Sequence, residues 1–278
     1  MGICDIYFLL KRKQKMKVCT LASSSKGNCI LVYTENTKIL IDLGVTVSYV
    51  EEKLNRLKIN PAEIDAILNT HEHIDHTKNI GAFMRKYGTP LYCHIDGYDK
   101  LLTKLGKVDL DNIVCFEEFP FRIGDFVIRA FKLPHDASSC VGFTFEENGN
   151  RFSIATDLGH IDDEIINNLR GSKLVILESN HDEKMLANNP KYPYLLKQRI
   201  LGKSGHLSNK LCAEAILKLV NSGVKQILLA HLSEENNTPE LAYNTICEYL
   251  SRFGIIKGTH IKIDVAPANG FSNIFYLK

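Results

Sequence analysis

The stretch NTHEHIDHTKN, residues 69–79, places three of the chain's ten histidines and two acidic residues within the six positions from His71 to His76. Imidazole is a weak helix former and is seldom fully buried, so ordinary packing gives no reason for such a cluster. The preceding run DAILNT (65–70) is strand-like, and HEHID is therefore expected to form the loop at its carboxyl end. His71 and His73 are two positions apart. On an extended loop two such residues can face one point, whereas on a helix they would point in different directions.

The spacing H-x-H-x-D-H predicts two adjacent metal sites. The zincin pattern H-E-x-x-H is excluded, because the fourth residue after His71 is Asp75. What remains is an imidazole pair, His71 and His73, for a first cation, and the pair Asp75 and His76 for a second. Two cations roughly 3.5–4 Å apart can activate water and stabilise an in-line displacement. The alternative is a polar surface loop, but three neutral imidazoles would gain nothing there.

Residues of the kinds that bind metals also follow three later apolar runs. His135 comes after FVIRAFKL and the turn-forming Pro134, Asp157 ends SIATD, and His231 ends VKQILLAH. Each is a weak signal alone, but together they predict further ligands, with the Asp157 carboxylate able to bridge two cations. Asp42, at the end of KILID, is expected to accept a hydrogen bond from a ligand imidazole. The predicted metal ligands are His71, His73, Asp75, His76, His135, Asp157 and His231.

The order of the apolar runs predicts two β-sheets with helices packed outside them. A hairpin is expected over 29–43, with Glu35 and Asn36 at its turn. Later strands are expected at 113–116, 126–132, 140–146, 151–156, 173–178, 224–231, 260–265 and 272–277. Helices are expected at 48–59, 76–87, 208–221 and 239–252. This order favours an α/β (α+β) fold of four layers, α/β/β/α, as one domain over residues 16–278.

Composition restricts the compartment and the partners. At 278 residues and 45% apolar the chain can bury a large core, and its net charge of +2 predicts no partner by bulk charge. Eight cysteines without a C-x-x-C pair indicate reduced thiols. No apolar run approaches the roughly 18 residues that span a bilayer, and residues 1–15 lack the order of a signal peptide. We expect a cytoplasmic protein without membrane contact or an inferable obligate protein partner, in which residues 1–15 are an N-terminal extension from an upstream start.

The predicted ligands resemble, in their order along the chain, the ligand set of the metallo-β-lactamase superfamily, and Asp42 matches that superfamily's supporting aspartate. The resemblance covers Lys17 to the C-terminus. It implies a four-layer αββα metallo-β-lactamase sandwich with a two-metal site on one edge. Lactamases, thioesterases, lactonases and nucleases share this centre, so the ligands leave the substrate open.

Four stretches outside the ligands resemble the YycJ/WalJ branch of the superfamily, whose members are described as DNA exonucleases. They are LASSSKGNC (21–29), LESNHD (177–182), KSGHLSN (203–209) and AHLSEENNTPE (230–240). SGH at 204–206 is also similar to the phosphate-binding SGH of β-CASP nucleases, although the chain is too short for a full β-CASP insertion. The resemblance implies a 5′-to-3′ exonuclease, with Ser204 near the substrate and His206 as a phosphate contact or proton donor. His181 is expected to bind substrate, with a structural hydrogen bond as the alternative.

A basic strip supports a nucleic-acid substrate independently. Residues 184–210 carry six basic residues, two tyrosines and no acid, which suits phosphates and exposed bases, although a solvated surface is the alternative. Lys197, Arg199 and Lys203 are the expected phosphate contacts. The predicted function is phosphodiester hydrolysis in nucleic acid, with DNA favoured over RNA by the resemblance, two divalent Mn²⁺ or Zn²⁺ ions, and Asp75 orienting the attacking water. The alternatives are a glyoxalase II-type thioesterase or lactonase with an apolar or thiol-recognising pocket, and a DNA-binding regulatory protein without catalysis.

Overall fold

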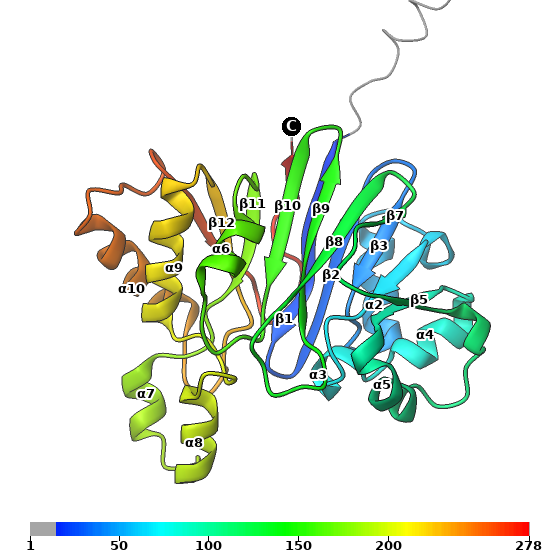
Figure 1. Ribbon diagram of the computed structural model, residues 1–278, viewed down its shortest axis with the longest axis horizontal. Helices are drawn as coiled ribbons and strands as arrows, with labels where there is room; N and C mark the ends of the chain where they lie inside the picture. Colours follow the sequence, from blue (N-terminus) through cyan, green and yellow to red (C-terminus); the bar gives the residue numbers. More distant parts are fainter. Residues whose placement is uncertain (1–14, 278) are drawn as a thin grey trace, which may run out of the picture.

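Two β-sheets packed face to face form the centre of the protein (Figure 1). The computed structural model describes residues 15–277, so the extension expected at residues 1–15 lies, apart from Lys15, outside the described residues. Sheet A contains, in spatial order, β14 (Phe275–Leu277), β1 (Met16–Ser24), β2 (Gly27–Tyr33), β3 (Lys38–Ile41), β4 (Ala66–Leu68), β5 (Leu91–His94) and β6 (Ile113–Phe116). Sheet B contains β13 (Lys262–Val265), β12 (Gln226–Ala230), β11 (Leu174–Glu178), β10 (Asn150–Ala155), β9 (Val141–Glu147), β8 (Phe126–Lys132) and β7 (Phe121–Ile123).

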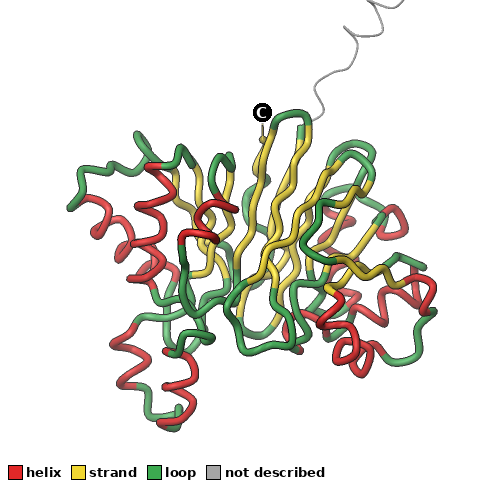
Figure 2. Tube along the Cα trace, viewed as in Figure 1, coloured by secondary structure: helices red, strands yellow, loops and turns green. Residues whose placement is uncertain are grey.

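Helices cover the outer faces of both sheets (Figure 2). Sheet A is covered by α2 (Val47–Arg56), α4 (Ile80–Tyr87) and α5 (Tyr98–Leu105), and sheet B by α6 (Asp163–Leu169), α9 (Asn209–Asn221) and α10 (Pro239–Ser251). The helices α3 (Ile74–Thr77), α7 (Glu183–Asn188) and α8 (Tyr194–Leu201) contribute no side chain to the apolar cores. The predicted four-layer αββα architecture is confirmed. No helix within residues 15–277 is both long and apolar enough to cross a bilayer.

Buried apolar side chains occupy three interfaces. One core lies between the two sheets and includes Phe143, Phe145 and Phe152, which are fully buried. A second joins sheet A to α2, α4 and α5, and a third joins sheet B to α6, α9 and α10. Fully burying a side chain of this size stabilises the fold by about 1.5–3 kcal/mol. The strand ends that carry the predicted ligands are therefore held by a large apolar framework.

The two sheets repeat one pattern of strand pairing. Sheet A has antiparallel pairs from β14 to β3 and parallel pairs from β3 to β6. Sheet B has antiparallel pairs from β7 to β10 and parallel pairs from β10 to β13. Asp42 follows β3 and Asp157 follows β10, so the two aspartates leave corresponding strands. Because ligands bind outside the carboxyl ends of parallel strands, this edge is where a site is expected.

The structure divides the helix expected over 76–87 into α3 and α4. The main chain of Leu43 explains the break: its N–H donates to the His76 carbonyl at 2.7 Å, and its carbonyl accepts from the Asn79 N–H at 3.0 Å. The segment after β3 therefore takes the hydrogen bonds that a continuous helix would use. Among the elements that the apolar pattern did not predict are β5, β7, α5, α6, α7 and α8. In α8 no side chain is buried, so the period of a core-facing helix is absent.

Candidate metal centre and substrate pocket

The histidine cluster follows β4 as predicted, with His73 as the N-terminal cap of α3. α3 lies against the segment after β3 so closely that a Cβ atom on Gly44 would stand 1.6 Å from the Asp75 carbonyl oxygen. Only glycine permits this approach. The close packing fixes Asp75 and His76 on a short helix beside the extended His71 and His73.

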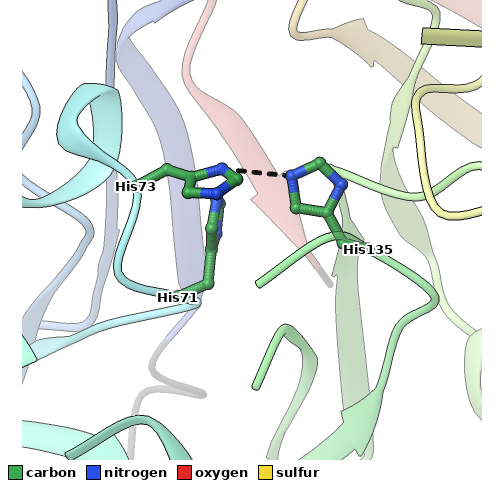
Figure 3. A group of neighbouring side chains, drawn as sticks. All are labelled: His71, His73 and His135. Carbon is green, nitrogen blue, oxygen red and sulfur yellow. Dashed lines mark hydrogen bonds between the residues drawn. The ribbon is translucent and has the colours of Figure 1, made fainter. Parts of the chain in front are cut away.

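His71, His73 and His135 form the first group of possible metal ligands, and their rings converge from two separate segments (Figure 3). One ring nitrogen from each lies within 4.8 Å of the other two. His135 Nε2 is 3.2 Å from His73 Nδ1, and His135 Nδ1 donates to the Gly205 carbonyl at 3.0 Å. His71 Nε2 is buried without a hydrogen-bond partner. Burial, and then the neighbouring imidazoles, hold the pKa of His71 well below its usual value, so its ring is neutral and can bind a cation.

Asp75, His76 and His231 form a second group, with Asp157 between the two. His76 Nε2 lies 3.3 Å from a carboxylate oxygen of Asp75 and 3.3 Å from one of Asp157. Asp157 also approaches His135 Nε2 at 3.9 Å, and its Oδ2 is buried without a hydrogen-bond partner. These buried N and O donors fit two divalent cations that share the Asp157 carboxylate. The clusters are therefore consistent with a binuclear metal site.

Buried carboxylates orient two of these imidazoles. His76 Nδ1 is 2.7 Å from Asp42, and His231 Nδ1 is 2.7 Å from Glu178. A carboxylate only accepts, so Nδ1 carries the proton in both rings and Nε2 faces the site. Burial alone would lower the pKa of His231, but Asp157, Asp75 and Glu178 outweigh it and raise that pKa to about 10. Without metal ions, His231 therefore carries a proton on both ring nitrogens at neutral pH.

Three residues of the site have left-handed backbone conformations. The φ angles are 58° at Asp42, 65° at Asp157 and 56° at His231. Such a conformation costs a residue other than glycine about 1–3 kcal/mol and persists only where the surroundings hold it. At these three positions the strand has just ended, and the side chains lie among the clustered histidines and carboxylates at that edge of the sheets.

Glu178 contacts two histidines of the site, and the sequence patterns did not single it out. It ends β11, is fully buried, and accepts N–H groups from Leu207 at 2.9 Å and Leu158 at 3.2 Å. His206 Nδ1 lies 2.8 Å from the same carboxylate. Burial lowers the pKa of His206, but Glu178 outweighs it and raises that pKa. The signal was present, since Glu178 ends an apolar strand as Asp157 and His231 do.

Asn28, near the start of β2, is a second residue that was missed. Its Oδ1 accepts the Ser24 N–H at 3.2 Å, which turns the Nδ2 group toward the site. Nδ2 is 3.1 Å from His76 Nε2 and 3.4 Å from Asp75 Oδ2. An amide nitrogen has no free lone pair for a cation, so Asn28 presents a donor beside the second group.

A pocket of about 510 Å³ opens above these residues. Its floor includes His73, Asp75, Asp157, His206 and His231. Its walls include Lys104, Asp136, Tyr192, Leu196, Arg199, Ile200 and Ile74. Arg199 Nε forms an ion pair with Asp136, which itself lies 3.4 Å from His135 Nε2.

The other residues expected to bind substrate do not line this pocket. Lys203 and Ser204 are exposed on the loop between α8 and His206. The Lys197 ammonium donates to the Ala187 carbonyl at 2.7 Å. His181 is 1% exposed, and neither ring nitrogen has a hydrogen-bond partner. Burial lowers the pKa of His181 to about 4, so this ring is neutral at pH 7.

Comparison with known proteins identifies the family. Residues 37–232 match the family described as Beta-lactamase superfamily domain, and the chain belongs to this superfamily. It is 35% identical over 255 residues to "Exodeoxyribonuclease WalJ" of Streptococcus pneumoniae, covering 90% of this chain and 94% of that protein. It is 32% identical over 244 residues to "Exodeoxyribonuclease YycJ" of Bacillus anthracis, covering 87% and 92%.

Solved structures agree on the fold. The metallo-beta-lactamase fold protein YhfI of Bacillus subtilis superposes with a TM-score of 0.70 at 16% identity, covering 93% of this chain and 99% of that one. The resemblance predicted from the ligand residues is confirmed. Family, relatives and clustered donors together make this chain a metal-dependent hydrolase related to the WalJ and YycJ proteins.

Proposed function

We propose that this protein is a two-metal exonuclease that removes nucleotides from DNA in the 5′-to-3′ direction. The observation that carries the proposal is a single pocket at which several groups meet. They are the two metal-ligand groups, the His206–Glu178 pair, and the basic side chains of Lys104 and Arg199. Relatives that cover most of the chain are named exodeoxyribonucleases, which favours DNA. The direction is carried over from the same resemblance.

The cation ligands divide into two sets that share Asp157. One set would be His71, His73, His135 and Asp157, and the other Asp75, His76, His231 and Asp157. A donor set of imidazoles and carboxylates without thiolate suits Mn²⁺ or Zn²⁺. When bound, the cations would lower the pKa of a water molecule and neutralise charge on the phosphate.

The protein's own groups would orient the attack and protonate the leaving group. Asp75 would accept a hydrogen bond from the attacking water and hold it in line with the scissile bond. As the water oxygen bonds to phosphorus, the water would release one proton to the solvent, the bond to the leaving oxygen would break, and that oxygen would take the proton from His206 Nε2. His206 can donate because Glu178 holds Nδ1 and raises the pKa of the ring. Glu178 would then stabilise the ring and keep Nε2 directed at the pocket.

Basic residues would hold the nucleic-acid backbone. Arg199 and Lys104 line the pocket and would contact phosphates next to the scissile bond. Lys203 and Ser204 lie outside the pocket on the loop that leads to His206, and would contact phosphates further along the strand. Lys197, held by the Ala187 carbonyl, would add long-range attraction. His181 is buried and would act through neighbouring residues.

A comparison of substrates tests the proposal. The metal-loaded protein would be given a DNA duplex labelled at the 5′ end, the same duplex labelled at the 3′ end, a single-stranded RNA and an acyl-glutathione thioester. We expect early release of the label from the 5′-labelled DNA and late release from the 3′-labelled DNA. Thioester turnover without release of nucleotides would establish the thioesterase alternative. DNA binding without turnover of any substrate under metal-replete conditions would establish the regulatory alternative.

A further inference from the structure

An exposed isoleucine lies in the middle of the metal-ligand motif. Ile74 is 59% exposed, although His71 and His76 in the same motif are buried. It lies between His73 and Asp75 in the sequence and lines the pocket with them. A single exposed apolar side chain needs no partner, so Ile74 bears on substrate binding only together with the other apolar side chains that line the same pocket.

The pocket wall formed by α8 and by Tyr192, two residues before that helix, is also largely apolar. Tyr192, Leu196 and Ile200, each four residues apart, line the same pocket. No side chain of α8 is buried, so this helix contributes little to the core. α7 and α8 project together beyond the sheets (Figure 1). The Arg199–Asp136 ion pair connects α8 to the segment that carries His135. The backbone of Gly205, next to His206, also packs closely against the last turn of α8.

Polar contacts hold this wall next to the proposed proton donor. The His206 N–H donates to the Ile200 carbonyl at 2.9 Å, and a Cβ atom on Gly205 would stand 2.1 Å from that oxygen. The end of α8 is therefore fixed relative to His206. Its apolar side chains remain open to the pocket, where a substrate held by the metal ligands must pass.

We propose that Ile74 and the ridge formed by Tyr192, Leu196 and Ile200 are a nucleobase-binding subsite, which holds the base of the nucleotide at the scissile phosphate. The inference rests on the proposed function, since a phosphate over the metal ligands carries its nucleoside into these walls. Enzymes hold an unstacked base between apolar and aromatic side chains. Lys104 and Arg199 in the same pocket favour a phosphate-bearing ligand over an uncharged acyl chain. The terminal base of a duplex would have to leave its pair to enter.

Oligonucleotides that lack one base test the subsite. The metal-loaded protein would be given a DNA strand with natural nucleotides and the same strand with an abasic nucleotide at the attacked end. We expect the abasic end to lower kcat/KM by roughly 5- to 150-fold, the range for loss of one base-stacking contact. Leu196→Ala and Ile74→Ala should each lower kcat/KM for the natural strand and reduce the difference between the two strands. A duplex with a mismatched terminal pair should be cut faster than a fully paired one.

The matched control is Leu195→Ala, on the same helix but 79% exposed and outside the pocket lining. It should retain the wild-type preference for the natural strand. Metal content would be measured for every variant. This measurement shows whether Ile74→Ala disturbs the neighbouring metal ligands or only removes a contact with the base. Equal turnover of natural and abasic strands by the wild-type protein would overturn the subsite and leave the nuclease standing. A wild-type protein that turns over the thioester but has no nuclease activity, with lower thioester turnover in Leu196→Ala, would overturn both the subsite and the proposed nuclease function. The same side chains would then bind an acyl chain.

Discussion

Replacing Glu178 by glutamine removes a charge while keeping the shape of a fully buried side chain. Glu178 is the shared acceptor for His206 Nδ1 at 2.8 Å and His231 Nδ1 at 2.7 Å. A glutamine oxygen can still accept the N–H groups of Leu207 and Leu158, but its NH₂ group then faces the two rings. Both imidazoles would then accept a hydrogen bond at Nδ1 and carry their proton on Nε2. A protonated Nε2 has no free lone pair, so His231 could no longer bind a cation through that atom.

The structure sets the size of the expected effect. A hydrogen bond to a charged group contributes about 1.5–3 kcal/mol and a neutral one about 0.5–1.5 kcal/mol, so each imidazole bond weakens by roughly 1–1.5 kcal/mol. For His231 this alone is roughly a tenfold loss of metal affinity, and the reversed tautomer extends it to about 10–100-fold. Loss of the correctly oriented donor at His206 should lower kcat by about 10²–10⁴-fold.

Metal titration by calorimetry and single-turnover cleavage of labelled DNA measure the two effects separately. The matched control is Glu147→Gln, which neutralises another buried carboxylate at the opposite end of β9 from the site. It should leave metal affinity and cleavage close to the wild-type values. If Glu178→Gln binds two cations with wild-type affinity and cleaves at the wild-type rate, Glu178 does not set the tautomers of His206 and His231.

Four further outcomes are expected. Metal analysis should find close to two divalent ions per chain, falling toward one in His71→Ala, and a wild-type value that stays at one would contradict the shared Asp157 arrangement. Metal binding at pH 7 should release protons, because His231, with its pKa raised to about 10, carries a proton that the metal must displace. Calorimetry in buffers of different ionisation enthalpy measures this release, and a binding enthalpy that does not depend on the buffer would contradict it. Cleavage should decline as pH rises through the raised pKa of His206, since only the protonated ring donates, and His206→Asn should lose this alkaline limb. Arg199→Ala should reduce the slope of log Kd against log salt for DNA by roughly one, whereas Lys218→Ala, which removes a lysine paired with Asp163 on the outer helices, should not.

Local sequence patterns were sufficient for much of the framework. The strand expected at 126–132 matches β8, where the alternation of apolar residues follows their burial. The strand expected at 113–116 matches β6, although Val114 and Cys115 are exposed, because its residues include two that are β-branched and one that is aromatic. The metal-type residues were recognisable because they stand immediately after such runs. In a sheet with parallel strands, the residues after several strands meet at one edge, so their types alone predicted the clusters that the fold assembles.

The connections between these segments were decided by tertiary structure alone. Glu178 holds His206 and His231, 28 and 53 residues later, and no local period records that distance. Leu196 and Ile200 on α8 belong to no core-facing pattern, since they line a pocket and no side chain of this helix is buried. Lys197 and Lys203 looked equivalent to Arg199 in the basic strip, yet only Arg199 lines the pocket. Sequence reports how each segment is buried, whereas which side chains meet depends on strand register and chain crossings, which only the packed sheets determine.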